Sequence, residues 1–120
     1  MHEMSLAGGV LQLVEDTLRA QPPVRLRAIT VDVGALAGVD LAALRFALEA
    51  LRAGTVLQDA QIEIQELPAS AWCLDCAQSV EISSRLDDCP RCGGRHLQPL
   101  AGSELRLREL IVDDLVSESL

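Results

Sequence analysis

The residue types best suited to hold a metal are four cysteines arranged in two pairs. The stretch CLDC contains Cys73 and Cys76, and CPRC contains Cys89 and Cys92, with twelve residues between the pairs. A two-residue gap lets both thiolates of a tight turn face one point, and two such turns complete the sulfur tetrahedron that Zn²⁺ prefers. The spacing therefore predicts a zinc tetrathiolate. With four protein ligands, no position is left for water or substrate, so the zinc would be structural.

Thiol redox chemistry is the alternative use of a Cys-x-x-Cys pair. A redox motif would be expected once, at the start of a helix in a thioredoxin-like pattern, whereas this chain has two pairs. His96 follows the second pair and could serve as a spare ligand. Because four sulfurs already satisfy a zinc ion, a solvated surface histidine is favoured.

A second group of candidate ligands lies at the start of the chain, where MHEMS places His2 beside Glu3. A histidine in the second position is too large for easy removal of the initiator, so Met1 should keep its free amine. That amine, the backbone nitrogen of His2 and its imidazole can form adjacent chelate rings around one metal once the amide is deprotonated. Such nitrogen-rich, tetragonal coordination suits Ni²⁺ or Cu²⁺. Glu3 could add an oxygen ligand or a supporting hydrogen bond.

Both N-terminal side chains also have ordinary explanations. His2 would be a polar residue of a frayed terminus, and the helix dipole favours a carboxylate such as Glu3 in a first turn. The residues alone leave these alternatives open.

The composition of the chain argues against nucleic acid and membrane as partners. The chain has 120 residues, a net charge of −8 and 2% aromatic residues, so it would repel a phosphate backbone and offer few rings for base stacking. No apolar run approaches the roughly 20 residues that span a bilayer, and the start lacks a signal-peptide pattern. We expect a cytoplasmic protein that binds neither nucleic acid nor membrane. In that compartment thiols stay reduced, which favours metal over disulfides.

Two segments have the apolar spacing of amphipathic helices. The first ends at Pro22 and Pro23, and its stripe consists of Leu6, Val10, Leu13, Val14 and Leu18. The second has a credible N-cap at Asp40 and a C-terminal cap at Gly54, and its stripe consists of Leu41, Leu44, Leu48 and Leu51.

Three segments have strand composition: residues 24–34, 60–67 and 104–114. In the first, Ile29, Val31 and Val33 alternate with Thr30 and Asp32, and a change of phase before Ile29 indicates a late start or a bulge. The sequence predicts an α+β fold, a small three-stranded sheet covered by two helices. The expected core between these layers comprises Leu18, Leu44, Leu48, Ile62, Ile64 and Ile111.

The cysteine segment interrupts this pattern as an insertion. We expect residues 1–69 and 99–120 to form one α+β domain and residues 70–98 a zinc-ribbon module. A segment of about thirty residues buries too little to fold alone, so the metal would supply its stability.

Six stretches together give a specific resemblance. MHEMS, VDVGALAGVD, RFALEALRAGT, CLDC, CPRCGG and GSELRLRELIVD occur in this order along the chain. They resemble the HypA/HybF family of hydrogenase maturation nickel chaperones over essentially the whole length. Met4, where leucine is commoner, and VLQDA at 56–60 depart from the family pattern without touching a ligand.

The resemblance implies a nickel-binding α+β domain with a late zinc module. It places the nickel ligand on His2, with Met1 and Glu3 beside it, and the zinc ligands on the four cysteines. It further implies a non-enzymatic metallochaperone that passes Ni²⁺ to the large subunit of a [NiFe] hydrogenase together with the GTPase HypB. Exposed strand edges would permit a homodimer.

Two other functions are weighed against this one. The chain could be a zinc-ribbon interaction module with an incidental N-terminal histidine, or a nucleic-acid-binding ribbon, which the charge disfavours. No P-loop and no nucleophile with a plausible base occur in the sequence, so we expect no enzymatic activity.

Overall fold

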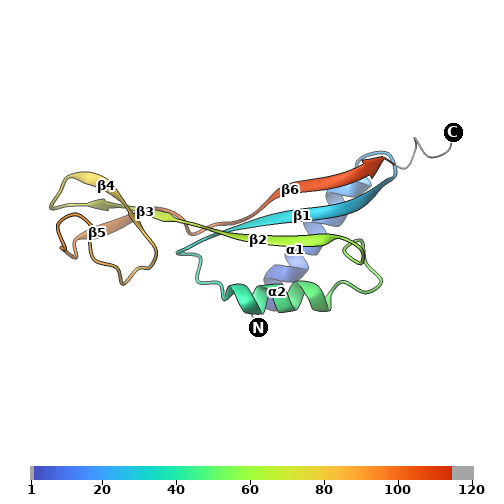
Figure 1. Cartoon of the computed structure of the whole chain (residues 1–120), viewed down its shortest axis with the longest axis horizontal. Coiled ribbons are helices and arrows are strands. Elements are labelled where there is room, and N and C mark those ends of the chain that lie inside the picture. Colours follow the sequence, from blue (N-terminus) through green and yellow to red (C-terminus); the bar gives the residue numbers. More distant parts are fainter. Residues whose placement is uncertain (1, 115–120) are drawn as a thin grey trace. The chain divides into compact units, whose positions relative to one another are not determined.

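The computed structural model describes residues 2–114 and combines helices with two small sheets (Figure 1). Its elements are α1 (His2–Arg19), β1 (Val24–Gly34), α2 (Leu41–Ala50), β2 (Gln61–Leu67), β3 (Ala69–Cys73), β4 (Gln78–Ile82), β5 (Leu97–Ala101) and β6 (Leu105–Asp114). The strands form two three-stranded sheets, ordered β2-β1-β6 and β4-β3-β5. The predicted α+β class is confirmed, and the second sheet is an addition to it. Neither described helix is long and apolar enough to cross a membrane.

The described chain divides into two compact units. The first contains residues 2–31, 39–64 and 107–114, and the second contains residues 32–38 and 65–106. All four cysteines belong to the second unit, whereas His2 and Glu3 belong to the first.

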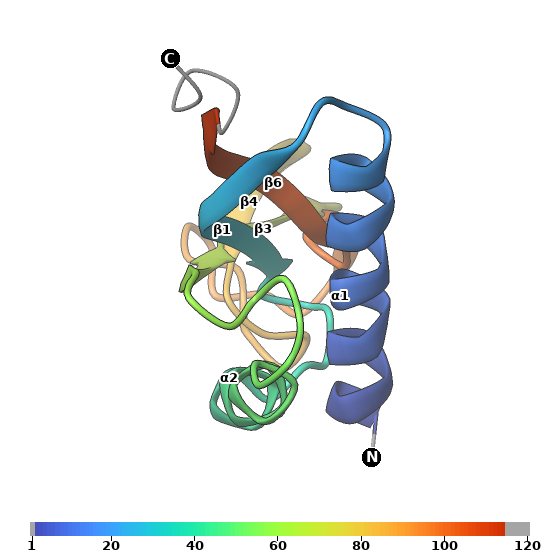
Figure 2. The ribbon, with the colours of Figure 1, turned by 90° about the vertical axis from the view of Figure 1, so that its right-hand side faces the viewer.

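In the first unit, α1 packs against α2, which lies near the beginning of α1 (Figure 2). The side chains that the two helices bury are small or aliphatic: Ala7, Val10, Val14, Leu44, Ala47 and Leu48. The predicted N-cap is confirmed, because Oδ1 of Asp40 accepts the backbone N–H of Ala43 at 3.1 Å. Helix α2 ends at Ala50, earlier than expected, and Gly54 takes a φ of +75° in the turns beyond it.

The predicted core is correct for Leu44, Leu48 and Ile62, which are buried. One expected core residue, Ile111, is instead 43% exposed, and two others, Leu18 and Ile64, are half-buried. Leu13, a member of the predicted helical stripe, is 52% exposed. Leu13 lies at the margin of the α1 stripe, whose centre is the buried Ala7, Val10 and Val14. Along β6 the alternation of half-buried and exposed residues shifts by one position between Leu107 and Leu110. A regular alternation would put Ile111 on the buried face, whereas it lies on the exposed one.

Strand β1 is covered on both faces near its end. Its alternating pattern suggested that Thr30 and Asp32 would face solvent, but they are only 8% and 5% exposed. As the middle strand of its sheet, β1 has a neighbour on each side. It also begins at Val24, so the change of phase before Ile29 does not mark a late start.

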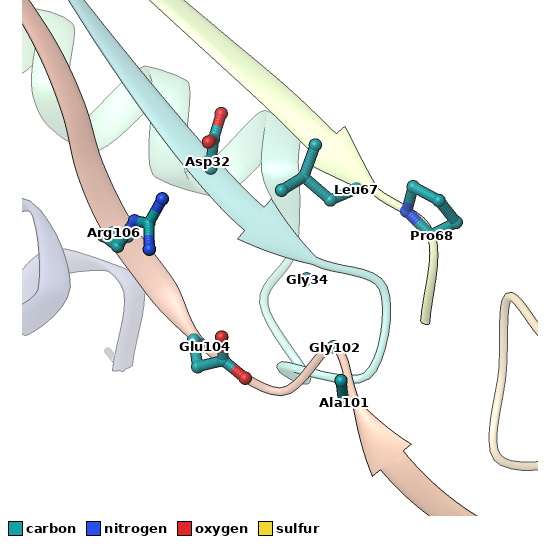
Figure 3. Close-up of a pocket in the computed structure, with 8 residues that line it drawn as sticks. All are labelled: Asp32, Gly34, Leu67, Pro68, Ala101, Gly102, Glu104 and Arg106. Atoms are coloured by element: carbon teal, nitrogen blue, oxygen red, sulfur yellow. The ribbon is translucent and has the colours of Figure 1, made fainter. Parts of the chain in front are cut away.

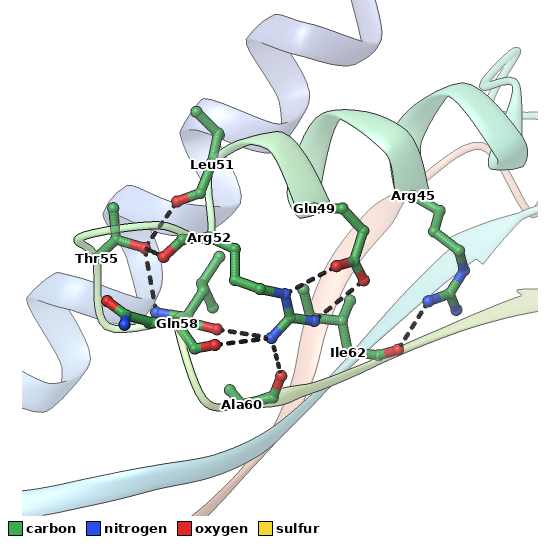
Figure 4. Close-up of polar contacts among 9 residues, drawn as sticks. Arg45, Glu49, Leu51, Arg52, Thr55, Gln58, Ala60 and Ile62 are labelled. Atoms are coloured by element: carbon green, nitrogen blue, oxygen red, sulfur yellow. Dashed lines mark hydrogen bonds and ion pairs between the residues drawn. The ribbon is translucent and has the colours of Figure 1, made fainter.

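Arg52 organises the loop between α2 and β2 (Figure 4). Its Nη1 donates to the carbonyls of Leu57, Gln58 and Ala60. Its Nε and Nη2 donate to the Glu49 carboxylate at 2.8 and 3.0 Å, and this bond raises the pKa of Arg52. One guanidinium thus satisfies three loop carbonyls, which fixes the VLQDA segment.

Two glycines allow backbone segments of the second unit to touch. Gly34 donates its N–H to Glu104 O, and Leu36 donates to Gly102 O, each at 2.8 Å. A Cβ on Gly34 would overlap the Gly102 carbonyl, and one on Gly102, whose φ is +111°, would lie 2.7 Å from Ala69 Cα. Figure 3 shows both glycines at the edge of a cavity of about 210 Å³. These positions require glycine for space, and Gly102 requires it for conformation as well.

We predict that Gly34→Ala destabilises the protein by about 2–4 kcal/mol, because backbone must move to admit the new methyl group. Gly8→Ala is the matched control: a Cβ at Gly8 meets no atom within 4 Å, so alanine should stabilise α1 by up to about 1 kcal/mol. Chemical denaturation followed by circular dichroism measures both. Equal effects of the two substitutions would contradict the close backbone approach.

Candidate metal centre

The four cysteine sulfurs converge on one point, as the spacing predicted. All four Sγ atoms lie within 4.8 Å of one another, and the distances from Cys73 to Cys92 and from Cys76 to Cys89 are 3.7 and 3.9 Å. A zinc tetrathiolate with Zn–S bonds of about 2.3 Å has sulfur–sulfur edges of about 3.8 Å. A disulfide would require about 2.05 Å, so the cluster fits a tetrahedral metal site and contains no disulfide among its cysteines.

Each Cys-x-x-Cys pair forms the same tight turn. Ala77 donates its N–H to Cys73 O, and Gly93 donates to Cys89 O, both at 2.8 Å. The donor residue takes a left-handed conformation in both turns, with φ of 54° at Ala77 and 74° at Gly93. Backbone N–H groups of Cys76 and Arg91 also point at the sulfurs of Cys73 and Cys89, at 3.4 Å. These turns aim both sulfurs of a pair inward and stabilise negative charge on them.

The sulfurs also belong to the core of the second unit. Its buried cluster consists of Leu36, Ala69, Ala71, Cys73, Val80, Ile82 and Cys89. Two of these seven side chains are candidate ligands. The sheet that presents the first turn is held by antiparallel pairing of β3 with β4 and with β5. Burial differs among the ligands, since Cys73 and Cys89 are buried, Cys76 is intermediate and Cys92 is exposed.

Without metal, the thiols do not ionise alike. Backbone N–H groups of Cys92 and Arg91 lower the pKa of Cys89 to about 6. The neighbouring Cys92 sulfur and then burial raise the pKa of Cys76 to about 12. At neutral pH the site therefore offers a thiolate at Cys89, while Cys76 must lose its proton to bind a metal.

His96 lies beside the cluster without joining it. Its Nδ1 is 2.9 Å from Asp75 Oδ2, and the His96 side chain is 71% exposed. The metal-binding group found among the described residues contains only the four cysteines. This contact joins Asp75, which lies inside the first Cys-x-x-Cys turn, to His96, which follows the second turn.

The N-terminal candidates are placed only in part. His2 is an exposed residue of the first turn of α1, and Met1 lies outside the described residues. Glu3 Oε2 accepts the backbone N–H of Asp40 at 3.1 Å. Sequence reasoning missed this bond, because its partners are 37 positions apart. The bond lowers the pKa of Glu3, so the carboxylate is ionised at neutral pH.

The family model and the related proteins that match this chain belong to one family. The family described as "Hydrogenase/urease nickel incorporation, metallochaperone, hypA" matches residues 1–112. Hydrogenase maturation factor HypA from Cupriavidus necator is 49% identical over 114 residues, 95% of this chain and 96% of that protein. Its namesake from Azotobacter vinelandii is 47% identical over 113 residues, 94% of this chain and 100% of the relative.

Solved structures share the fold. The solution structure of the Ni metallochaperone HypA from Helicobacter pylori has a TM-score of 0.62 at 22% identity and covers 90% of this chain and 94% of its own. Another structure, titled "Solution structure of HypA protein", has a TM-score of 0.64 at 24% identity, with coverage of 96% and 97%.

An α+β fold with a four-sulfur metal site, matched in this way, defines a nickel metallochaperone of hydrogenase maturation. The chain belongs to the HypA family. The resemblance seen in the sequence is confirmed. The family is one of maturation factors, not of enzymes.

Zinc binding should depend on pH. Because Cys76 has a pKa of about 12 without metal, zinc binding at neutral pH releases at least its proton. Affinity for Zn²⁺ should therefore rise about tenfold or more per pH unit between pH 6.5 and 8, and should fall more steeply below the Cys89 pKa of about 6. Competition with a chromogenic chelator measures this. An affinity independent of pH would contradict thiolate ligation.

The stabilising contribution of Glu3 should depend on pH. Its folded pKa is depressed, so its bond to the Asp40 N–H stabilises the fold above the unfolded pKa and is lost as pH falls through the folded one. Glu3→Gln should lower stability at pH 7 and make little difference near pH 3. Urea denaturation across this range tests the sign, and Glu15→Gln, in the same helix, is the control. A constant penalty at every pH would refute the ionic contribution.

Proposed function

We propose that this protein is a metallochaperone that binds Ni²⁺ at its N-terminus and delivers it to the large subunit of a [NiFe] hydrogenase. HypB, the GTPase implied by the resemblance, would be its partner, and the cytoplasm its compartment. The observation that carries the proposal is membership of a nickel metallochaperone family combined with a solvent-exposed His2 at the start of α1.

The first turn of a helix suits the proposed chelate. Nickel would bind the Met1 amine, the deprotonated backbone nitrogen of His2 and the His2 imidazole. The first four N–H groups of an α-helix have no carbonyl partner within the helix. Deprotonating the His2 amide therefore breaks no helical hydrogen bond. The negative charge that this creates also lies at the positive end of the helix dipole.

Glu3 would have two tasks. Its Oε2 binds the Asp40 N–H, which ties the beginning of α1 to the N-cap of α2. A carboxylate has a second oxygen, and the lowered pKa of Glu3 keeps the group charged at neutral pH. We propose that it approaches the nickel directly or through water while it holds the start of α2 in place.

The cysteine cluster would hold Zn²⁺ as a structural ion. The sulfur spacing of 3.7 and 3.9 Å supports this assignment. Four thiolates suit zinc, whereas the nitrogen donors of the N-terminus suit nickel. We retain the division of function between residues 1–69 with 99–120, for nickel, and residues 70–98, for zinc. The open edges of β2 and β6 would allow a homodimer.

Nickel binding should depend on His2. Calorimetric titration of untagged, zinc-loaded protein should show one Ni²⁺ per chain, and His2→Ala should abolish this binding while zinc remains. His96→Ala is the matched control, because the second histidine of the chain is also exposed but lies in the zinc unit. A short tag added before Met1 should likewise abolish binding, since it removes the free amine.

Two outcomes would overturn the proposal. Equal nickel binding by the wild type and His2→Ala would place the nickel elsewhere. Loss of nickel in His96→Ala, with binding kept in His2→Ala, would assign it to the zinc unit. A further comparison, Glu3→Gln, should weaken nickel binding more than its effect on unfolding at pH 7 explains if the carboxylate ligates.

A further inference from the structure

The four cysteine residues differ in exposure to solvent, and Cys92 is the most exposed of them. Cys73 is 0% exposed and Cys89 3%, whereas Cys92 is exposed. The residues after Cys92 are Gly93 and Gly94, which have no side chains to cover it. A Cβ added at Gly94 would lie 3.2 Å from Cys92 Sγ. Glycine at this position therefore leaves the sulfur open.

The sulfur nearest to the exposed one is buried. Cys92 Sγ lies 3.7 Å from Cys73 Sγ, the shorter of the two cross-turn distances. A cysteine is labile to oxidation when it is a thiolate, is accessible and has a resolving thiol nearby. Zinc would hold all four sulfurs as thiolates, so exposure and geometry distinguish them. Cys92 is the exposed residue, and Cys73 is the neighbouring thiol inside the core.

We propose that Cys92 is a modification site for small neutral peroxides, which release the zinc by oxidising this sulfur first. Cys92 thiolate attacks hydrogen peroxide: one oxygen is transferred to give a sulfenic acid, and the other leaves as water after taking up a proton. The Cys73 thiolate then attacks the sulfenic sulfur and forms a Cys73–Cys92 disulfide. With a second proton the sulfenic oxygen leaves as water. Only Cys76 and Cys89 would then remain as thiolate ligands, too few to retain a zinc ion.

The chemistry on the surface favours peroxide as the oxidant. The net charge of −8 repels anionic disulfides, whereas hydrogen peroxide is uncharged. Loss of zinc would also disturb folding, because Cys73 belongs to the buried cluster of the second unit. Oxidation at one exposed sulfur would thus be felt throughout that unit.

The test uses full-length, zinc-loaded protein whose zinc content is first measured. This initial measurement separates failure of the zinc assignment from failure of the present proposal, since a protein without zinc would contradict the former. Hydrogen peroxide is then added, and zinc release is followed with a chromogenic chelator. Dimedone traps the sulfenic acid for mass spectrometry.

The chain simplifies the mapping. Arg91 lies between Cys89 and Cys92, so trypsin places them in separate peptides, residues 86–91 and 92–95. We expect the first dimedone adduct on 92–95 and the first disulfide between this peptide and residues 53–85, within which fragmentation in the mass spectrometer should assign Cys73 and not Cys76. A first adduct on 86–91, or an initial Cys76–Cys89 disulfide, would overturn the proposal.

A matched pair of ligand variants provides an independent arm. Histidine can replace one cysteine in a four-ligand zinc site, so Cys92→His and Cys76→His should both load zinc. Cys92→His should release zinc at least about tenfold more slowly under peroxide, while Cys76→His should resemble the wild type. Equal protection by both variants would contradict a special role for Cys92. If either fails to bind zinc, the peptide mapping of the wild type still decides.

Discussion

The convergence of four thiolates is the constraint on which the second unit depends. Its buried cluster contains only seven side chains, and Cys73 and Cys89 are two of them. So small a core stabilises little by apolar burial, and without a metal the gathered sulfurs ionise at unlike pH values. A bound metal would therefore couple to folding in this unit, because it would join the two Cys-x-x-Cys turns and the sheet that carries them.

In the first unit, a hydrogen bond links the beginnings of the two helices. In a capping box, the N3 residue of a helix binds the backbone N–H of its own N-cap. Helix α2 has Ala43 at N3, which cannot do so, and Glu3 of α1 supplies the carboxylate instead. The beginning of α1 is thus held by the start of another helix. Glu3, which the sequence offered both as a candidate nickel ligand and as an ordinary first-turn carboxylate, also completes the terminus of a second helix.

Local signals in the sequence predicted local structure well. Asp40 caps its helix and each Cys-x-x-Cys pair forms a tight turn, because both features depend on spacing within a few residues. The sequence did not predict the strands β3, β4 and β5, each of which is only five residues long and too short to show a clear alternation. Nor did it predict the Gly34–Gly102 approach or the Glu3–Asp40 bond, which depend on which distant segments become neighbours. Composition also gave no reason to bury Asp32, because that depends on strand order.

Donor chemistry explains how one small chain could handle two metals without confusing them. Four thiolates close a coordination sphere, and with Cys73 and Cys89 buried, an incoming ligand reaches the ion only at the exposed side. A chelate at the N-terminus would have the opposite property. Its few protein ligands would be exposed to solvent, so a ligand of the receiving protein could bind the metal before the first ligands are released. A buried site with four protein ligands would retain its metal, whereas an exposed site with few protein ligands would transfer it. On the proposed function, a nickel site at the first residues of a helix would favour fast transfer, because the same ligands inside a core would release nickel too slowly.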